Sequence, residues 1–251
     1  LSDINLNLGV KFYLNSSITE VDTKSKIISF VKDSKDERLN YDHLIFATDP
    51  VTPSKLIKGF KQDIELDEIG TSGKVTAFFK NPVRWKESNE YSDSFRFIFS
   101  NNNLDKFEEA SQNALKNSGD YFAGFIQIYP DGSAQRTMNN NESYDKLILF
   151  TKNLSYDKKA DDLDKVKDEI INTVLPYIEN ANDLVYSKFL TPKDLNNTFY
   201  FPKGNIDHIT LTGKQNYNKR TFSKNPNNFY SYYDLKDVYY CGAGSFPCGS
   251  V

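Results

Sequence analysis

Cysteine, histidine, tryptophan and methionine are scarce in this chain of 251 residues, which holds two, two, one and one of them. The spacing of Cys241 and Cys248 fits no common zinc motif, so we expect no metal site. Two free thiols are the favoured reading, and a disulfide between them stays open. His43 and His208 are far apart in the sequence, which argues against a histidine-based nucleophile relay, and we expect a structural role for His43.

An excess of positive charge and a long hydrophobic run are also absent. Lys and Arg number 31 against 34 Asp and Glu, giving a net charge of −3, which argues against a nucleic-acid partner. The mean hydropathy is −0.60 and no apolar stretch is long enough for a membrane-spanning helix. We therefore expect a cytoplasmic protein, and peripheral contact with a membrane surface stays open.

Aromatic residues, in contrast, are abundant, with 19 Phe and 16 Tyr, and they favour β-strands. A short apolar run over 44–47 predicts a strand that is buried on both faces. Alternating patterns and further apolar runs predict the other strands. The chain is thus expected to have an α+β fold with a mixed or antiparallel sheet. The other strands are expected over 10–14, 18–21, 27–31, 75–79, 95–99, 122–129, 147–150 and 185–190.

Helices are expected at four places. Residues 104–115 are rich in helix-forming side chains, and residues 161–179 carry one apolar stripe that Pro176 should end or kink. Thr191 followed by Pro192 is typical of a helix start. Residues 51–70 are expected to be helical and then irregular. Asn139–Asn141 marks a loop, and 196–236 shows little periodicity.

The end of the chain joins a strand to a glycine-rich turn. Val238–Tyr240 predicts a strand, and Gly242 and Gly244 follow it. A strand that runs into Gly-x-Gly lets backbone approach a ligand closely, because glycine has no Cβ. The helix that normally follows such a turn is missing, and the chain begins with Leu1 instead of Met. We expect the chain to be a piece of a larger protein.

Three segments together resemble the phytoene desaturase and retinol saturase branch of the flavin-dependent, amine-oxidase-like enzymes. Within that branch the chain is most similar to the pyridine nucleotide-disulfide oxidoreductase domain proteins. A weaker fourth similarity lies in Gly70–Val75. The three segments are Gly9–Phe12 with Ser17–Val21 and Ala47–Pro50, then Leu190–Leu195 with Gly204–His208, and finally Tyr239–Val251.

The resemblance implies a fold and a division of the chain. Members of that family hold the pyrophosphate of FAD with a Gly-x-Gly-x-x-Gly motif in a Rossmann unit, and this chain has no such motif. The main anchor of FAD would therefore lie upstream. Residues 1–50 would be the second part of the FAD-binding domain, 51–236 the substrate-binding domain, and 237–251 the return strand with a truncated turn.

The resemblance also implies the cofactor-binding residues. The backbone at Ile18 would face the adenine, and a strand end would lie near the dinucleotide. One turn would pass the pyrophosphate and ribityl chain, and the last residues would lead to the isoalloxazine ring. Cys248 stands where the family has a small glycine, and Ala243 offers no acidic side chain to a ribityl hydroxyl. The implied residues after Ile18 are Ala47, Thr48, Asp49, Gly242, Ala243, Gly244, Gly249, Ser250 and Val251.

The function implied is that of an FAD-dependent oxidoreductase. The complete protein would transfer hydride between flavin and an apolar small molecule, such as a polyene or another lipid-like substrate, and this chain alone would be inactive. The resemblance names no catalytic residue. The aromatic strands over 95–99 and 122–129 would form one wall of a substrate tunnel. Two alternatives stay open, a non-catalytic lipid- or prenyl-binding escort protein of the same fold and a secreted ligand-binding β domain.

Overall fold

The structure, a computed structural model, divides into two compact units. Unit 1 comprises Leu1–Glu65 and Ile209–Val251, and unit 2 comprises Leu66–His208. Both contain helices and β-sheets, which confirms the α+β class. The assignment of 1–50, 51–236 and 237–251 to flavin-binding and substrate-binding domains stays a prediction. The residues described are 2–61, 69–87, 93–132, 144–158, 160–208, 222–225, 227–228 and 230–245.

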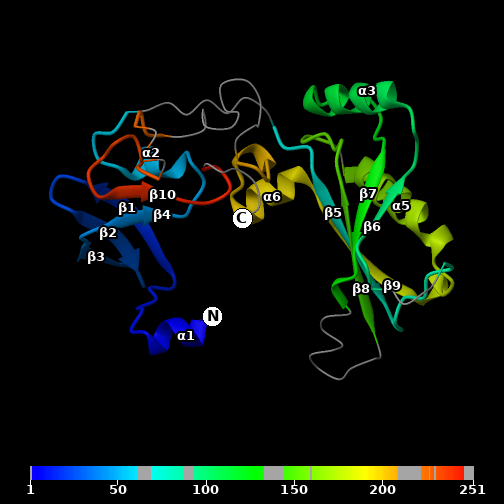
Figure 1. The fold of residues 1–251 in the computed structure, drawn as a ribbon, viewed down its shortest axis with the longest axis horizontal. Helices are drawn as coiled ribbons and strands as arrows, with labels where there is room; N and C mark the ends of the chain where they lie inside the picture. Colours follow the sequence, from blue (N-terminus) through cyan, green and yellow to red (C-terminus); the bar gives the residue numbers. More distant parts are fainter. Residues whose placement is uncertain are drawn as a thin grey trace. The chain divides into compact units, whose positions relative to one another are not determined.

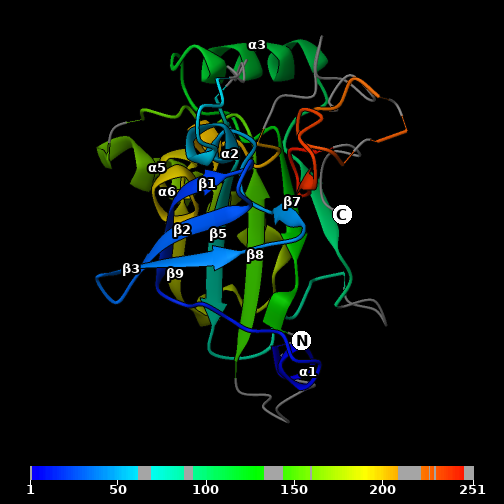
Figure 2. The ribbon, with the colours of Figure 1, turned by 90° about the vertical axis from the view of Figure 1, so that its left-hand side faces the viewer.

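Unit 1 contains a three-stranded antiparallel sheet, drawn in blue in Figure 2. Its strands are β1 (Ser16–Asp22), β2 (Ile27–Lys32) and β3 (Lys35–Asn40), in that order. The prediction of a strand over 10–14 is wrong. A helix, α1 (Ser2–Asn7), precedes that segment, and the alternating side chains in it have no buried face to serve, since Leu14 is 73% exposed.

A second sheet in unit 1 pairs two strands that lie far apart in the sequence. β4 (Leu44–Phe46) runs parallel to β10 (Val238–Tyr240), with Phe46 opposite Tyr240. The expected burial of β4 on both faces is wrong, because Ile45 is 63% exposed and only the flanking positions face the core. A short helix, α2 (Thr52–Leu56), follows β4, and the chain is irregular after it up to residue 61, which agrees with the expectation for the described part of 51–70.

The core of unit 1 lies between these sheets and α2. Tyr232 and Tyr240 are 0% and 1% exposed and are its largest members. Aromatic rings surround them, with Phe222 in edge-to-face contact with Tyr240 at a centroid distance of 5.1 Å. The apolar residues that complete this core are Val21, Leu44, Phe46, Ile57 and Val238.

Unit 2 is built on one five-stranded antiparallel sheet with the strand order β6-β7-β8-β5-β9 (Figure 1). Every strand expected in this region is present. The strand expected over 122–129 begins later, at Phe125, because Gly124 has a φ of +62° that no strand residue adopts. The strands are β5 (Gly73–Phe79), β6 (Arg96–Phe99), β7 (Phe125–Tyr129), β8 (Asp145–Thr151) and β9 (Leu184–Leu190).

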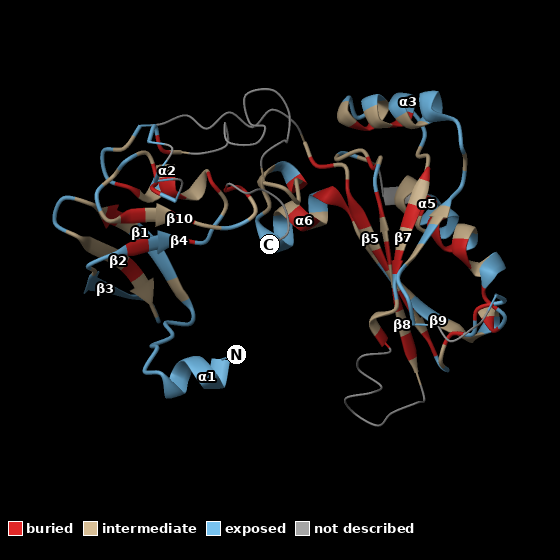
Figure 3. Cartoon of the chain, in the orientation of Figure 1, coloured by how far each residue is buried: buried red, intermediate tan, exposed pale blue. Residues whose placement is uncertain are grey.

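One face of this sheet is covered by α5 (Ala160–Val174), as the burial colours of Figure 3 show. The apolar stripe of α5 packs against the inward side chains of β5, β7 and β8. Pro176 acts as expected, because α5 ends at Val174 and a 3-10 turn, η1 (Leu175–Tyr177), follows. The buried residues that α5 contributes are Val166, Ile170, Ile171 and Val174.

Two further helices of unit 2 also confirm the sequence pattern. α3 (Leu104–Leu115) begins after Asn103, whose side chain accepts a hydrogen bond from the backbone N–H of Asp105. α6 (Pro192–Phe199) begins with a full capping box between Thr191 and Asp194. Two 3-10 turns, η2 (Ala181–Asp183) and η3 (Pro202–Gly204), flank β9 and α6. The loop expected at Asn139–Asn141 lies outside the described residues.

Candidate functional site

The ends of β4 and β10 bring two of the predicted segments together in unit 1. Because the strands are parallel, their carboxyl ends meet at one edge, and ligands of α/β proteins commonly bind at such an edge. The backbone N–H of Cys241 donates to the carbonyl of Phe46 at 2.9 Å, so the pairing continues past the strands. We call residues 47–49 and 242–244 the carboxyl edge.

Two buried tyrosines hold the chain at the carboxyl edge. The hydroxyl of Tyr240 donates to the carbonyl of Thr48 at 3.0 Å, and the hydroxyl of Tyr232 donates to the carbonyl of Pro50 at 3.2 Å. Burial raises the pKa of Tyr232 far above its usual value, so this hydroxyl stays a donor. The sequence analysis missed Tyr232, and the aromatic run at 230–233 is the signal that could have revealed it.

The two glycines of the carboxyl edge have different roles. Gly242 is exposed with a φ of +122°, and a Cβ added there would meet only the carbonyl oxygen of Thr48, at 3.9 Å. Gly244 is buried, and a Cβ there would lie 2.8 Å from the Tyr240 hydroxyl and 3.1 Å from Pro50 Cδ. Gly242 therefore leaves backbone accessible to a ligand, whereas Gly244 lets the turn pack against Tyr240 and Pro50.

The carboxylate of Asp49 is hydrogen-bonded to neighbouring residues of the chain. Its Oδ1 accepts hydrogen bonds from the backbone N–H groups of Val51 at 2.8 Å and Thr52 at 3.0 Å, and its Oδ2 accepts one from the Thr52 hydroxyl. The carboxylate thus organises the start of α2. The surface that the carboxyl edge offers to a ligand consists of small, uncharged groups at Ala47, Thr48 and Gly242.

Of the remaining predicted cofactor residues, only Ile18 is among those described, and it lies in a different sheet from the carboxyl edge. Ile18 lies in β1, opposite Phe30 of β2, and its side chain is 42% exposed. A β-bulge between Ile18 and Glu20 interrupts the ladder there. Gly249, Ser250 and Val251 lie outside the described residues. The roles assigned to all ten residues by resemblance stay predictions.

A charged cluster occupies the opposite, amino end of β4 and β10. Lys26 Nζ lies 2.6 Å from Asp237 Oδ2, and His43 Nδ1 lies 3.6 Å from Asp237 Oδ1. The hydrogen bond from Lys26 lowers the pKa of the Asp237 carboxyl. His43 is thus remote from the carboxyl edge. His208 lies in unit 2 against the ring of Phe201, and Cys241 is a free thiol.

Among the residues described, no group of three His, Cys, Asp or Glu side chains could hold a metal ion. None of the helices described there is both long and apolar enough to cross a membrane.

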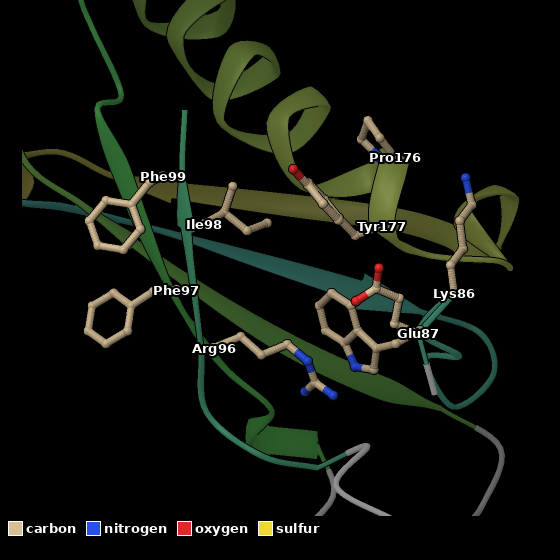
Figure 4. A pocket seen from close by; sticks show the side chains of 9 residues that line it. Lys86, Glu87, Arg96, Phe97, Ile98, Phe99, Pro176 and Tyr177 are labelled. Carbon is tan, nitrogen blue, oxygen red and sulfur yellow. The ribbon is translucent and has the colours of Figure 1, made fainter. Parts of the chain in front are cut away.

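A pocket of about 610 Å³ lies in unit 2 where β6 approaches the 85–87 segment and η1 (Figure 4). The guanidinium of Arg96 lies 4.3 Å from the centre of the buried Trp85 ring. Burial lowers the pKa of Arg96. The backbone N–H of Lys86 donates to the carbonyl of Tyr177, which fixes two of the walls. This volume suits a small molecule. The sequence analysis did not identify this pocket.

The aromatic side chains of β6 and β7 in unit 2 point to the sheet face that α5 does not cover. Figure 4 shows Phe97 and Phe99 on the opposite side of β6 from Arg96 and Ile98. Phe97 is 49% and Phe99 is 67% exposed, and both rings approach Phe125 of β7, with centroid distances of 6.4 and 6.3 Å. These rings are the ones expected to form a wall of a substrate tunnel.

No protein-family model matches this chain, and no curated protein matches it. Among solved structures, it is similar to CmlS, a flavin-dependent halogenase, with a TM-score of 0.41 and 13% identity over 76% of this chain and 30% of that one. It is also similar to the cyclohexylamine oxidase of Brevibacterium oxydans (TM-score 0.46, 9% identity, 91% and 42% covered) and to putrescine oxidase (TM-score 0.46, 15% identity, 96% and 45% covered).

The chain spans less than half the length of each of these structures. Identities and scores this low establish neither the family of the chain nor its function.

Proposed function

We propose that this chain is part of an FAD-dependent oxidoreductase, with FAD lying along the carboxyl edge of unit 1. The observation that carries the proposal is the meeting of Ala47–Asp49 and Gly242–Gly244 at the end of a parallel strand pair. Thr48 and Gly242 are exposed and have no bulky side chains, which fits a ligand that approaches closely.

The charges at the carboxyl edge fit a secondary part of an FAD site. No Lys or Arg stands among residues 47–49 and 242–244, so a pyrophosphate would find only backbone N–H groups there. The main pyrophosphate anchor would then lie in another part of the protein. Ala47, Thr48 and Gly242 would bound the cofactor, and Tyr232 and Tyr240 would keep the edge in place.

When bound, FAD would supply the capacity to exchange a hydride with the substrate. The chain's own contribution is positional. The aromatic face of unit 2 would bind an apolar substrate and exclude water around it. The desaturase-like or saturase-like direction of the reaction and a polyene or another lipid-like molecule as the substrate belong to this proposal.

Flavin content measured in the complete protein tests the proposal. Gly242→Ala should lower the ratio of flavin absorbance to protein absorbance, because it adds a methyl group at the carboxyl edge. Gly59→Ala is the matched control, since Gly59 also has a positive φ, +68°, and open space around it, but lies beyond α2. Alanine tolerates the φ of Gly59 better than that of Gly242, so circular dichroism is needed to show that both variants are folded before their flavin ratios are compared.

Equal flavin ratios for the two variants would overturn the placement of FAD. A colourless complete protein that binds an apolar ligand would instead support the escort-protein alternative.

A further inference from the structure

The face of the unit 2 sheet that α5 leaves uncovered carries positive charge and no negative charge. Alternation along each strand assigns its residues to this open face, because side chains of successive residues point to opposite sides. The chain as a whole has a net charge of −3, so the absence of Asp and Glu here is a local feature. The open face consists of Phe97, Phe99, Phe125, Gln127, Tyr129, Lys146, Ile148, Phe150, Lys74, Thr76, Phe78, Tyr186, Lys188 and Leu190.

The strand register orders the open face into rows across the sheet. One row runs from Leu190 of β9 and Lys74 of β5 through Phe150 of β8 and Gln127 of β7 to Phe97 of β6. This row therefore has a lysine near its β9 end and an aromatic ring at its β6 end.

The neighbouring row begins at Lys188 in β9 and continues through Thr76 and Ile148 to Tyr129. The ring of Phe95 closes that row, at 4.8 Å from the ring of Tyr129.

The two lysines in these rows are diagonal neighbours on adjacent strands. Lys188 pairs with Thr76, and Lys74 lies two residues before Thr76 on the same face. Such neighbours have Cα atoms about 7–8 Å apart, so their ammonium groups can reach one anion between them. No ion pair to Lys74 or Lys188 occurs within the described parts of the chain, whereas Lys146 pairs with Asp131. Thr76 lies beside both lysines on the same face, directly opposite Lys188 and two residues from Lys74.

The aromatic end of the rows is an apolar surface that lies away from the two lysines. From β5 to β6 there are three strand spacings, or about 14 Å. Phe95, Phe97 and Tyr129 are 44%, 49% and 42% exposed, so their rings remain available to a ligand. The rings of Phe95 and Phe97 also support each other, at a centroid distance of 4.6 Å.

We propose that the open face binds an amphiphile with an anionic head, the head between Lys74 and Lys188 and the apolar tail over the aromatic rings of β6 and β7. The charge complementarity selects this occupant over a neutral polyene, which would leave both ammonium groups without an anion. In calling the amphiphile a substrate, the inference rests on the proposed function. The binding site itself is inferred only from the side chains of the unit 2 sheet.

Calorimetry with three probes that share one tail tests the inference. The chain should bind dodecanoate more tightly than dodecanol and much more tightly than dodecylamine, all below their micelle concentrations. Added salt should weaken the binding of dodecanoate and not that of dodecanol. Flavin absorbance does not enter this measurement, so its result is separate from that for the proposed function.

Two pairs of variants locate the head and the tail. K74Q/K188Q should weaken dodecanoate binding by roughly tenfold and leave dodecanol binding unchanged. Its control, K106Q/K165Q, makes the same change of charge on exposed positions of α3 and α5. Phe99→Ser should weaken both probes by about fivefold, and Phe199→Ser, also at an exposed phenylalanine, should weaken neither.

Circular dichroism confirms that each variant is folded. Equal binding of dodecanoate and dodecylamine, or equal binding of dodecanoate by K74Q/K188Q and the wild type, would overturn the inference. Binding of a single-stranded oligouridylate that K74Q/K188Q abolishes, with no binding of dodecanoate, would assign the open face to nucleic acid instead.

Discussion

Replacing Gly244 by alanine tests how tightly the carboxyl edge is packed. The added Cβ would lie 2.8 Å from the Tyr240 hydroxyl oxygen, so that one of the two must move, and 3.1 Å from Pro50 Cδ, which is a tight contact. Overpacking of this kind typically costs about 1–3 kcal/mol. If the hydroxyl moves, its hydrogen bond to the Thr48 carbonyl is also lost, at about 1 kcal/mol. We expect Gly244→Ala to lower the free energy of unfolding of unit 1 by about 2–3 kcal/mol.

A double-mutant cycle with Tyr240→Phe tests whether the Tyr240 hydroxyl is the group that clashes with the added Cβ. Removing the hydroxyl should cost about 1 kcal/mol alone and should relieve the clash, so the double variant should be more stable than the sum of the single losses by about 1 kcal/mol. Urea unfolding followed by circular dichroism measures this, and the fluorescence of the single tryptophan, Trp85, identifies the transition of unit 2 so that it can be told from that of unit 1.

Gly59→Ala provides the control, because nothing lies within 4 Å of its added Cβ, and its effect should simply add to that of Tyr240→Phe. If the effects of Gly244→Ala and Tyr240→Phe add within about 0.5 kcal/mol, the Tyr240 hydroxyl is not the obstacle and the reasoning is refuted.

Two further predictions concern unit 2. Hydrogen bonds from Asn180 and Asn81 lower the pKa of Asp183 to about 2, so this carboxylate stabilises the fold fully above its unfolded value of 3.8 and loses that effect as the pH falls toward 2. The stability of the wild type relative to Asp183→Asn, followed by Trp85 fluorescence in urea, should therefore shrink between pH 5 and pH 2, and a constant difference would contradict this. Thr191→Ala should cost about 1 kcal/mol by removing the capping box of α6. Thr173→Ala inside α5 should be neutral or slightly stabilising in the same unfolding assay, and equal losses would argue against the capping role.

The sequence predicted unit 2 better than unit 1, for a physical reason. The strands of unit 2 and α5 bury one regular face each, so the spacing of their apolar residues follows their geometry, and Pro176 and Thr191 mark the helix ends by local chemistry. Residues 10–14 show the same alternation without a sheet to pack on. Alternation therefore predicts a strand only where a partner exists.

The carboxyl edge shows what a single sequence leaves out. The glycines after β10 and the polar turn after β4 could be identified from residue types, but the contact between them depends on a pairing across the length of the chain. The role of Tyr232 depends on the same pairing, since its hydroxyl reaches the carbonyl of Pro50. The distinction between the open Gly242 and the packed Gly244 required coordinates as well.

The outer strand of the three-stranded sheet has a consequence for the behaviour of the protein in solution. β3 lies at the edge of its sheet with every side chain exposed, and Lys35, Asp36, Glu37 and Arg38 follow one another along it. Charged side chains on an edge strand discourage a strand of another molecule from adding to the sheet. Unit 1 is thereby protected from edge-to-edge aggregation at β3, whereas β6 of unit 2 presents Phe97 and Phe99 at its edge, and its one charged side chain, Arg96, stacks on Trp85.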